Sequence, residues 1–182
     1  MLIQQISVFL ENAPGALRDL TRVLGMGKID LMALSIADTQ NFGIVRLIVS
    51  SDKIDAAIAL LRSAGYTARV NNVVCAKVKN EPLGLCELLE LVNAIGESVE
   101  YLYSFLRSTG SDAMMIFRMT HQETAASKLA EKGAALVSQL PATLAEHRKQ
   151  LERAVEARGA VLLVDRERHP EVLQHREAGE DA

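Results

Sequence analysis

The amino-acid sequence repeats itself once, at an offset of 68 residues. Residues 12–17, Asn-Ala-Pro-Gly-Ala-Leu, align with residues 80–85, Asn-Glu-Pro-Leu-Gly-Leu, and apolar positions further along keep the same offset. Between Thr39 and Arg46 the offset grows by about two residues, which predicts a longer hairpin in the second copy. Each copy is about 70 residues long, enough for a domain and too long for one solenoid unit. We therefore expect two domains with the same fold.

The hydrophobic pattern of the first copy predicts the order strand, helix, strand, strand, helix, strand. Runs rich in β-branched residues predict strands at 3–10, 31–37, 43–49 and 66–70. Apolar residues at helical spacing predict a helix at 17–26 and a second one that is capped by Asp52 and ended by Gly65. This order is that of the ferredoxin-like βαββαβ unit, an α+β fold with an antiparallel sheet and both helices on one face.

The second copy gives the same order of elements. Strands are predicted at 73–78, 99–106, 113–119 and 134–138, and helices at 85–95 and 123–132. Only Asn71 and Asn72 separate the copies, and so short a connection favours two units held side by side in a fixed arrangement. The predicted domains are 1–72 and 73–140.

Charge marks off a third segment. Residues 142–182 carry 16 of the 43 charged side chains. This shift predicts a charged, helical C-terminal extension at 141–182, partly disordered at its end. The extension is either a solvated appendage or an arm that docks a partner or is exchanged within a dimer.

Composition excludes several classes of protein. A net charge of −3 argues against binding nucleic acid, because phosphates require a concentrated positive field. No apolar run is long enough to span a membrane, and the first residues do not resemble a signal peptide. With only Cys75 and Cys86, a disulfide framework is not expected, which favours a cytoplasmic location. Because no catalytic grouping and no metal-ligand spacing is present, we predict no catalytic residues, no metal and no cofactor.

The connections between the predicted elements point to a family. In the first copy a strand leads into Asn-x-Pro-Gly-x-Leu at 12–17, a helix follows, and Ile29-Asp30-Leu31 enters the second strand. This arrangement resembles the ACT domain, and segments 33–39 and 100–105 look like the second strands of tandem ACT proteins. The resemblance covers residues 2–139. It implies a sensor of small molecules, most often amino acids, that regulates an attached or partner enzyme.

The resemblance also implies where a ligand binds. In ACT proteins it typically lies where two units meet, between the first strand-to-helix loop of one unit and the start of the second strand of the other. The charges of an α-amino acid suit such a place. Its carboxylate suits the unpaired N–H groups of a helix N-terminus, which Gly15 lets it approach, and Asp30 offers a carboxylate to its ammonium group.

The candidate ligand-binding residues come from both copies, and each also has an ordinary role in a turn or at a strand end. They are Asn12, Ala13, Pro14, Gly15, Ala16, Leu17, Asp30 and Leu31 in the first copy, and Asn80, Leu83, Gly84 and Ser98 in the second. The second copy departs from the pattern, because Leu83 replaces Gly15 and Ser98 replaces Asp30. We therefore expect the first loop to carry the site.

Tyr101, Tyr103 and Phe105 alternate along one predicted strand and either pack under another layer or form the wall of a pocket. The leading hypothesis is a non-catalytic regulatory protein that binds an amino acid between ACT units, forms a homodimer and acts on a partner enzyme. The alternative is a ligand-free dimerisation or docking module that acts through its C-terminal extension. A third possibility is an enzyme of unrecognised chemistry, because a fold does not fix a function.

Overall fold

The computed structural model describes residues 2–38, 42–105, 112–138 and 140. The predicted features of 141–182 lie outside the described residues. The elements of the first copy are β1 (Ile3–Glu11), α1 (Ala16–Met26), β2 (Ala33–Asp38), β3 (Phe42–Ile48), the 3-10 turn η1 (Ser51–Lys53) and α2 (Ile54–Ser63). Those that follow are β4 (Thr67–Lys79), α3 (Gly84–Ala94), β5 (Val99–Ser104), β6 (Asp112–Met119) and α4 (Gln122–Glu131). The α+β prediction is confirmed.

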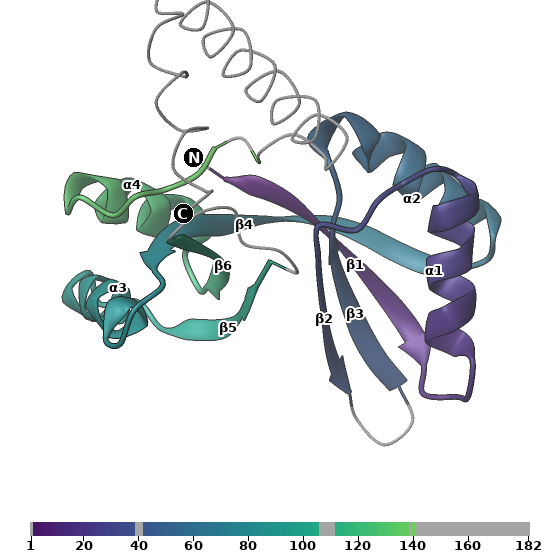
Figure 1. The fold of residues 1–182 in the computed structure, drawn as a ribbon, viewed down its shortest axis with the longest axis horizontal. Helices are drawn as coiled ribbons and strands as arrows, with labels where there is room; N and C mark the ends of the chain where they lie inside the picture. Colours follow the sequence, from purple (N-terminus) through teal and green to yellow (C-terminus); the bar gives the residue numbers. More distant parts are fainter. Residues whose placement is uncertain (1, 39–41, 106–111, 139, 141–182) are drawn as a thin grey trace, which may run out of the picture. The chain divides into compact units, whose positions relative to one another are not determined.

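The two copies share one long strand. The described strands form a six-stranded antiparallel sheet in the order β2-β3-β1-β4-β6-β5. The first half of β4 pairs with β1 up to Val73, and its second half pairs with β6 from Val74 onward (Figure 1). The strands predicted at 66–70 and 73–78 are therefore one continuous strand. Because no flexible linker intervenes, the two copies are held in a fixed arrangement.

Each copy has its own core beneath its own pair of helices. Side chains alternate between the two faces of a strand, so every second residue of β1 and β4 meets the helices. Ile6 and Val8 of β1 pack with Leu20 and Leu24 of α1 in the first core. In the second copy, one face of β4 and β6 packs against α3 and α4. Figure 1 shows α1 and α2 beside the first three strands and α3 and α4 beside β5 and β6.

A third core joins the copies through the sheet faces that the helices leave uncovered. Ile48 of the first copy packs in one cluster with Tyr103 and Ile116 of the second. Gln5 is fully buried here; its amide nitrogen donates to the hydroxyl of Tyr101 at 3.0 Å, and its amide oxygen accepts from the hydroxyl of Tyr103 at 2.9 Å. Burial raises the pKa of Tyr103 above its ordinary value, so this phenol stays a hydrogen-bond donor. Two alternatives were predicted for the tyrosine strand, packing under another layer or forming a pocket wall, and Tyr103 packs.

Two local predictions are wrong. The segment predicted as a strand at 134–138 makes only an isolated bridge between Leu136 and Ala76, so its pairing with β4 is too short to form a strand. Asp52 does not cap α2; it lies in η1, where it accepts a hydrogen bond from the hydroxyl of Ser50. The preceding 3-10 turn supplies the entry to α2, whose first residue has no side-chain cap.

The backbone repeats with the same offset as the sequence. The amide of Ala16 donates to the carbonyl of Ala13, and 68 residues later the amide of Gly84 donates to the carbonyl of Glu81, both at 3.1 Å. Gly65 and Gly133 both adopt positive φ, at 86° and 85°. The second hairpin connection is the longer one, as the shifted offset predicts: β2 ends at 38 and β3 begins at 42, whereas β5 ends at 104 and β6 begins at 112. The duplication is therefore structural.

Candidate functional site

The loop between β1 and α1 borders a cavity of about 280 Å³. Four of the predicted ligand-binding residues line it, together with five from neighbouring parts of β1, β2 and β3. The lining residues are Leu10, Glu11, Asn12, Ala13, Ala16, Leu17, Ile36, Gly43 and Val45. All of them belong to the first copy, and most of the wall is apolar.

The polar end of this cavity is the N-terminus of α1. Gly15 precedes the helix in the left-handed conformation, with φ of 87°, and no side chain caps the helix. The amide of Ala16 donates to the carbonyl of Ala13 and that of Asp19 to the carbonyl of Gly15, while the amides of Leu17 and Arg18 between them have no partner within the helix. The partial positive charge of the helix end favours a carboxylate at this place.

Glu11 and Asn12 supply the remaining polar groups. Glu11 is exposed at the end of β1, and no salt bridge in the described part of the chain involves it. Its carboxylate is therefore available to a cation. A cavity with an apolar wall, an anion-binding helix end and one carboxylate matches the three parts of an apolar α-amino acid.

Five of the lining residues are not among those predicted from the sequence: Leu10, Glu11, Ile36, Gly43 and Val45. A signal for some of them was present. Leu10 continues the alternation that places Ile6 and Val8 under the helices, and Glu11 directly precedes the predicted loop. Ile36 and Val45 reach the cavity through the pairing of β2 with β3, where they are direct neighbours, and that pairing is not readable from one strand alone.

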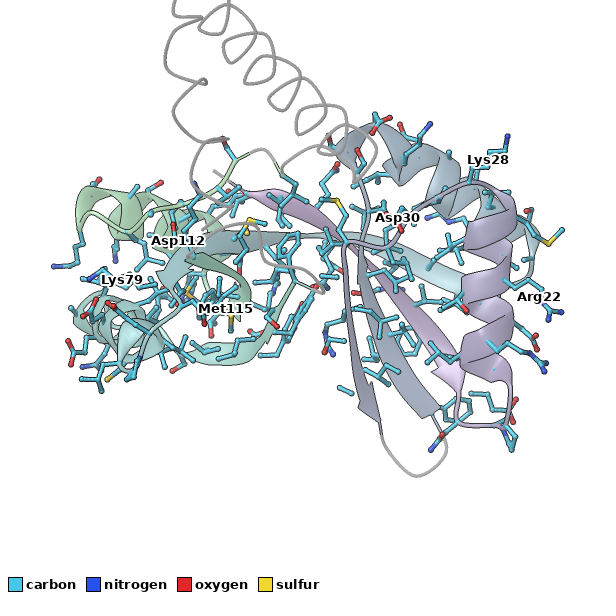
Figure 2. All side chains as sticks on the ribbon, viewed as in Figure 1. Arg22, Lys28, Asp30, Lys79, Asp112 and Met115 are labelled. Carbon is cyan, nitrogen blue, oxygen red and sulfur yellow. The ribbon has the colours of Figure 1, made fainter. Side chains whose placement is uncertain are left out.

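Asp30 and Leu31 do not line the loop cavity of their own copy. Asp30 lies beyond the C-terminal end of α1, near Lys28, whereas residues 12–15 lie at its other end (Figure 2). A helix of this length separates its ends by about 16 Å. An Asp30 carboxylate can thus meet such a loop only from another unit.

The loop between β4 and α3 has the same backbone conformation as the first loop but different side chains at its entrance. Leu83 occupies the position of Gly15 in the same left-handed conformation, with φ of 71°, and its side chain is 73% exposed. Gly84 is buried so closely against the carbonyl oxygen of Lys79 that a side chain there would overlap it. Asn80, which precedes α3 in the chain, and Ser98, which follows it, are both exposed. The departures noted in the sequence are therefore real differences between the loops.

Leu83 stores strain that a glycine would release. A left-handed backbone costs a residue with a Cβ about 1–2 kcal/mol, and the exposed Leu83 side chain recovers little of it through burial. We expect Leu83→Gly to raise the free energy of unfolding by about 1 kcal/mol. This net gain is the relieved strain minus the stability lost because glycine makes the unfolded chain more flexible. Urea unfolding followed by circular dichroism measures it, with Gly15→Leu as the reverse exchange. A destabilised Leu83→Gly protein would contradict this account.

Other reactive groups in the part of the chain that the structure describes offer no competing centre. Cys75 is buried in β4, where burial raises the pKa of its thiol to about 12, and Cys86 is exposed on α3. A thiol with so high a pKa is unreactive at neutral pH. Within the described ranges no three metal-ligating side chains gather. None of the described helices is both long and apolar enough to cross a membrane.

Comparisons with known proteins agree with this architecture. The family model described as ACT domain pair matches residues 1–141. The crystal structure of protein BT0572 from Bacteroides thetaiotaomicron is 34% identical, with a TM-score of 0.69 over 75% of this chain and 92% of that one.

More distant structures share the fold. The ligand-free regulatory subunit of aspartate kinase from Thermus thermophilus is 15% identical, with a TM-score of 0.52 over 72% of this chain and 94% of that one. The corresponding subunit from Thermus flavus is 14% identical, with a TM-score of 0.51 over the same shares. A search of the curated proteins gave no match. Because the family model spans both copies, the chain belongs to the family of ACT domain pairs.

Proposed function

We propose that this chain is a non-catalytic, cytoplasmic regulatory protein that binds an α-amino acid with an apolar side chain at the loop 12–17. The observation that carries the proposal is the cavity itself. It joins an apolar wall, the uncapped N-terminus of α1 and the carboxylate of Glu11 in about 280 Å³. The family and the aspartate kinase regulatory subunits, which share the fold, support a regulatory role.

The ligand is held in three places. Its carboxylate lies at the first-turn amides of α1, its side chain packs against Leu10, Ile36 and Val45, and its ammonium group pairs with Glu11. Ile36 is 46% exposed on β2, which is an edge strand of the sheet. A second ACT unit packing there, from the partner in a homodimer, would close the cavity and bring its own Asp30 to the loop. The ligand then acts by favouring one arrangement of the units, which a partner enzyme senses.

A thermal-shift screen of the twenty amino acids tests this function. A ligand that binds only the folded protein raises Tm, by an amount set by its concentration relative to Kd. We expect a shift of a few degrees at millimolar concentration for one or more apolar amino acids. If none of the twenty raises Tm, the ligand-free dimerisation module that works through residues 141–182 becomes the better hypothesis.

Two matched substitutions locate the ammonium partner. Glu11→Gln and Asp30→Asn remove the same charge from exposed side chains, so neither is expected to disturb the fold. We expect Glu11→Gln to weaken amino-acid binding about tenfold, the loss of one charge-assisted hydrogen bond. A comparable loss for Asp30→Asn, seen only when the protein is dimeric, would place the Asp30 of a neighbouring unit at the site. Unchanged affinity in both variants would contradict the proposed binding mode.

A further inference from the structure

A second cavity, of about 260 Å³, lies on the face of β1, β3 and β4 that α1 and α2 do not cover. It shares no residue with the loop cavity, and the second copy contributes two residues to its wall. Its lining residues are Ser7, Phe9, Ile44, Arg46, Arg69, Asn71, Tyr101 and Arg118. Three of these eight residues are arginines in a chain whose net charge is −3.

The strand register aligns the arginines. Ser7 of β1 is directly opposite Arg46 of β3 on one side and Arg69 of β4 on the other. Because neighbouring strands are about 4.8 Å apart, the backbones at Arg46 and Arg69 are about 10 Å apart on one sheet face. Arg118 pairs with Tyr101 in β5 and β6, so the second copy brings the third guanidinium to the same cavity.

The positive charge of this cluster is mostly uncompensated. All three guanidinium groups are permanently charged. Glu100 lies 3.6 Å from the Nε of Arg118, but the salt bridges found among the described side chains include neither Arg46 nor Arg69. Among the described side chains, three cations therefore face one carboxylate within salt-bridge distance. A concave surface with an excess of one charge concentrates the field and attracts counter-ions.

Two of the guanidinium groups are held in place by uncharged partners, in the case of Arg118 in addition to its salt bridge with Glu100. The Arg46 guanidinium lies over the ring of Tyr101, 3.9 Å from its centroid, and the Tyr101 hydroxyl in turn accepts from the buried Gln5 amide. Arg118 donates to the backbone carbonyl of Asn72 at 3.0 Å. These contacts fix the orientation of the planar donor groups, which favours binding a carboxylate or phosphate through paired hydrogen bonds.

We propose that this cavity binds a small organic anion that carries two negative charges, on one phosphate or on two carboxylates. The charged group lies between Arg46, Arg69 and Arg118, and the Ser7 hydroxyl and Asn71 amide supply uncharged hydrogen-bonding groups. The organic part packs against Phe9, whose side chain is 51% exposed, and Ile44. Both copies contribute cations, so the bound anion stabilises their mutual arrangement.

Calorimetric titration of the full chain at constant ionic strength tests the proposal with phenyl phosphate and phthalate, and with benzoate as the singly charged comparison. We expect at least one of the two doubly charged probes to bind with submillimolar Kd, and benzoate at least tenfold more weakly. Binding of phenyl phosphate alone identifies a phosphate site, and binding of phthalate alone a dicarboxylate site. Failure of both to bind at millimolar concentration, or equal binding of benzoate, would overturn the proposal.

Arginine variants distinguish binding of the anion in this cavity from its nonspecific attraction to positive charge elsewhere on the protein. Arg69→Gln and Arg46→Gln should each weaken binding of the active probe at least tenfold, while Arg22→Gln on α1, a matched loss of an exposed arginine, should leave it unchanged. Equal affinity in Arg69→Gln and Arg22→Gln would place the anion elsewhere. Since Arg69 is exposed, its variant should keep the fold, which an unchanged circular dichroism spectrum verifies. Amino-acid binding at the loop 12–17 is expected to be unaffected, so the two proposals fail independently.

Discussion

Replacing Gly84 by alanine is expected to lower the free energy of unfolding by about 3 kcal/mol, and Tm by about 10 °C. Gly84 begins α3, and an added methyl group would overlap the backbone carbonyl oxygen of Lys79, at the end of β4. A backbone oxygen within a sheet cannot move aside as a flexible side chain can. The helix must therefore shift away from the sheet and loosen the second core.

Gly25→Ala is the matched control for this prediction. Gly25 is an exposed residue within α1, and a methyl group there would meet nothing within 4 Å. Because alanine favours a helix over glycine, this variant should be more stable by about 0.8 kcal/mol. Equilibrium unfolding in urea, followed by circular dichroism, measures both. If Gly84→Ala is as stable as the unmodified protein, the close packing of α3 against β4 is wrong.

Gln5→Ala is expected to lower the free energy of unfolding by a similar amount, about 3 kcal/mol. The side chain is fully buried between the two copies, and its removal takes both hydrogen bonds with Tyr101 and the one from Tyr103. The Tyr103 hydroxyl is left buried with no acceptor in the described structure, next to a cavity of several methylene groups. The loss of stability thus measures how much the contacts of Gln5 between the two copies contribute to the free energy of unfolding.

Gln4→Ala controls for the loss of a glutamine at this end of β1. Gln4 is the preceding residue, points to the other face of the strand and is exposed, so its truncation should change stability by less than about 0.5 kcal/mol. Tyr103→Phe should show a smaller loss than Gln5→Ala, about 1 kcal/mol, because Gln5 keeps its contact with Tyr101. Equal stability of Gln5→Ala and Gln4→Ala would contradict a fixed interface between the copies.

The repeat and the hydrophobic periods suffice to predict the fold, because both copies place apolar residues on the helix-covered face of each strand. The short connection predicts that the copies lie side by side, but not which residues form the interface between them. Gln5, Ser7 and Arg46 alternate with core residues and therefore read as a solvent-facing side of a sheet. In the structure that side packs partly against the second copy, which buries Gln5 and covers Arg46 with Tyr101. Only the three-dimensional arrangement of the sheet decides this.

The candidate site was predictable in part for the same reason. Residues 12–17 form a local turn whose proline and glycine mark it in the sequence, and four of them line the cavity. Ile36, Gly43 and Val45 come from strands whose pairing with each other and with β1 brings them together. The left-handed backbone of Leu83 was not predicted, because leucine alone gives no such signal and only its alignment with Gly15 points to it.

The most direct test of an amino-acid site at the first loop is a titration of ¹⁵N-labelled protein followed by backbone amide chemical shifts. The titrant is whichever amino acid raises Tm most. We expect saturable shifts concentrated on residues 10–17 and on Ile36, Gly43 and Val45, with residues 80–84 unaffected. Shifts that leave residues 10–17 unchanged while others move would contradict it.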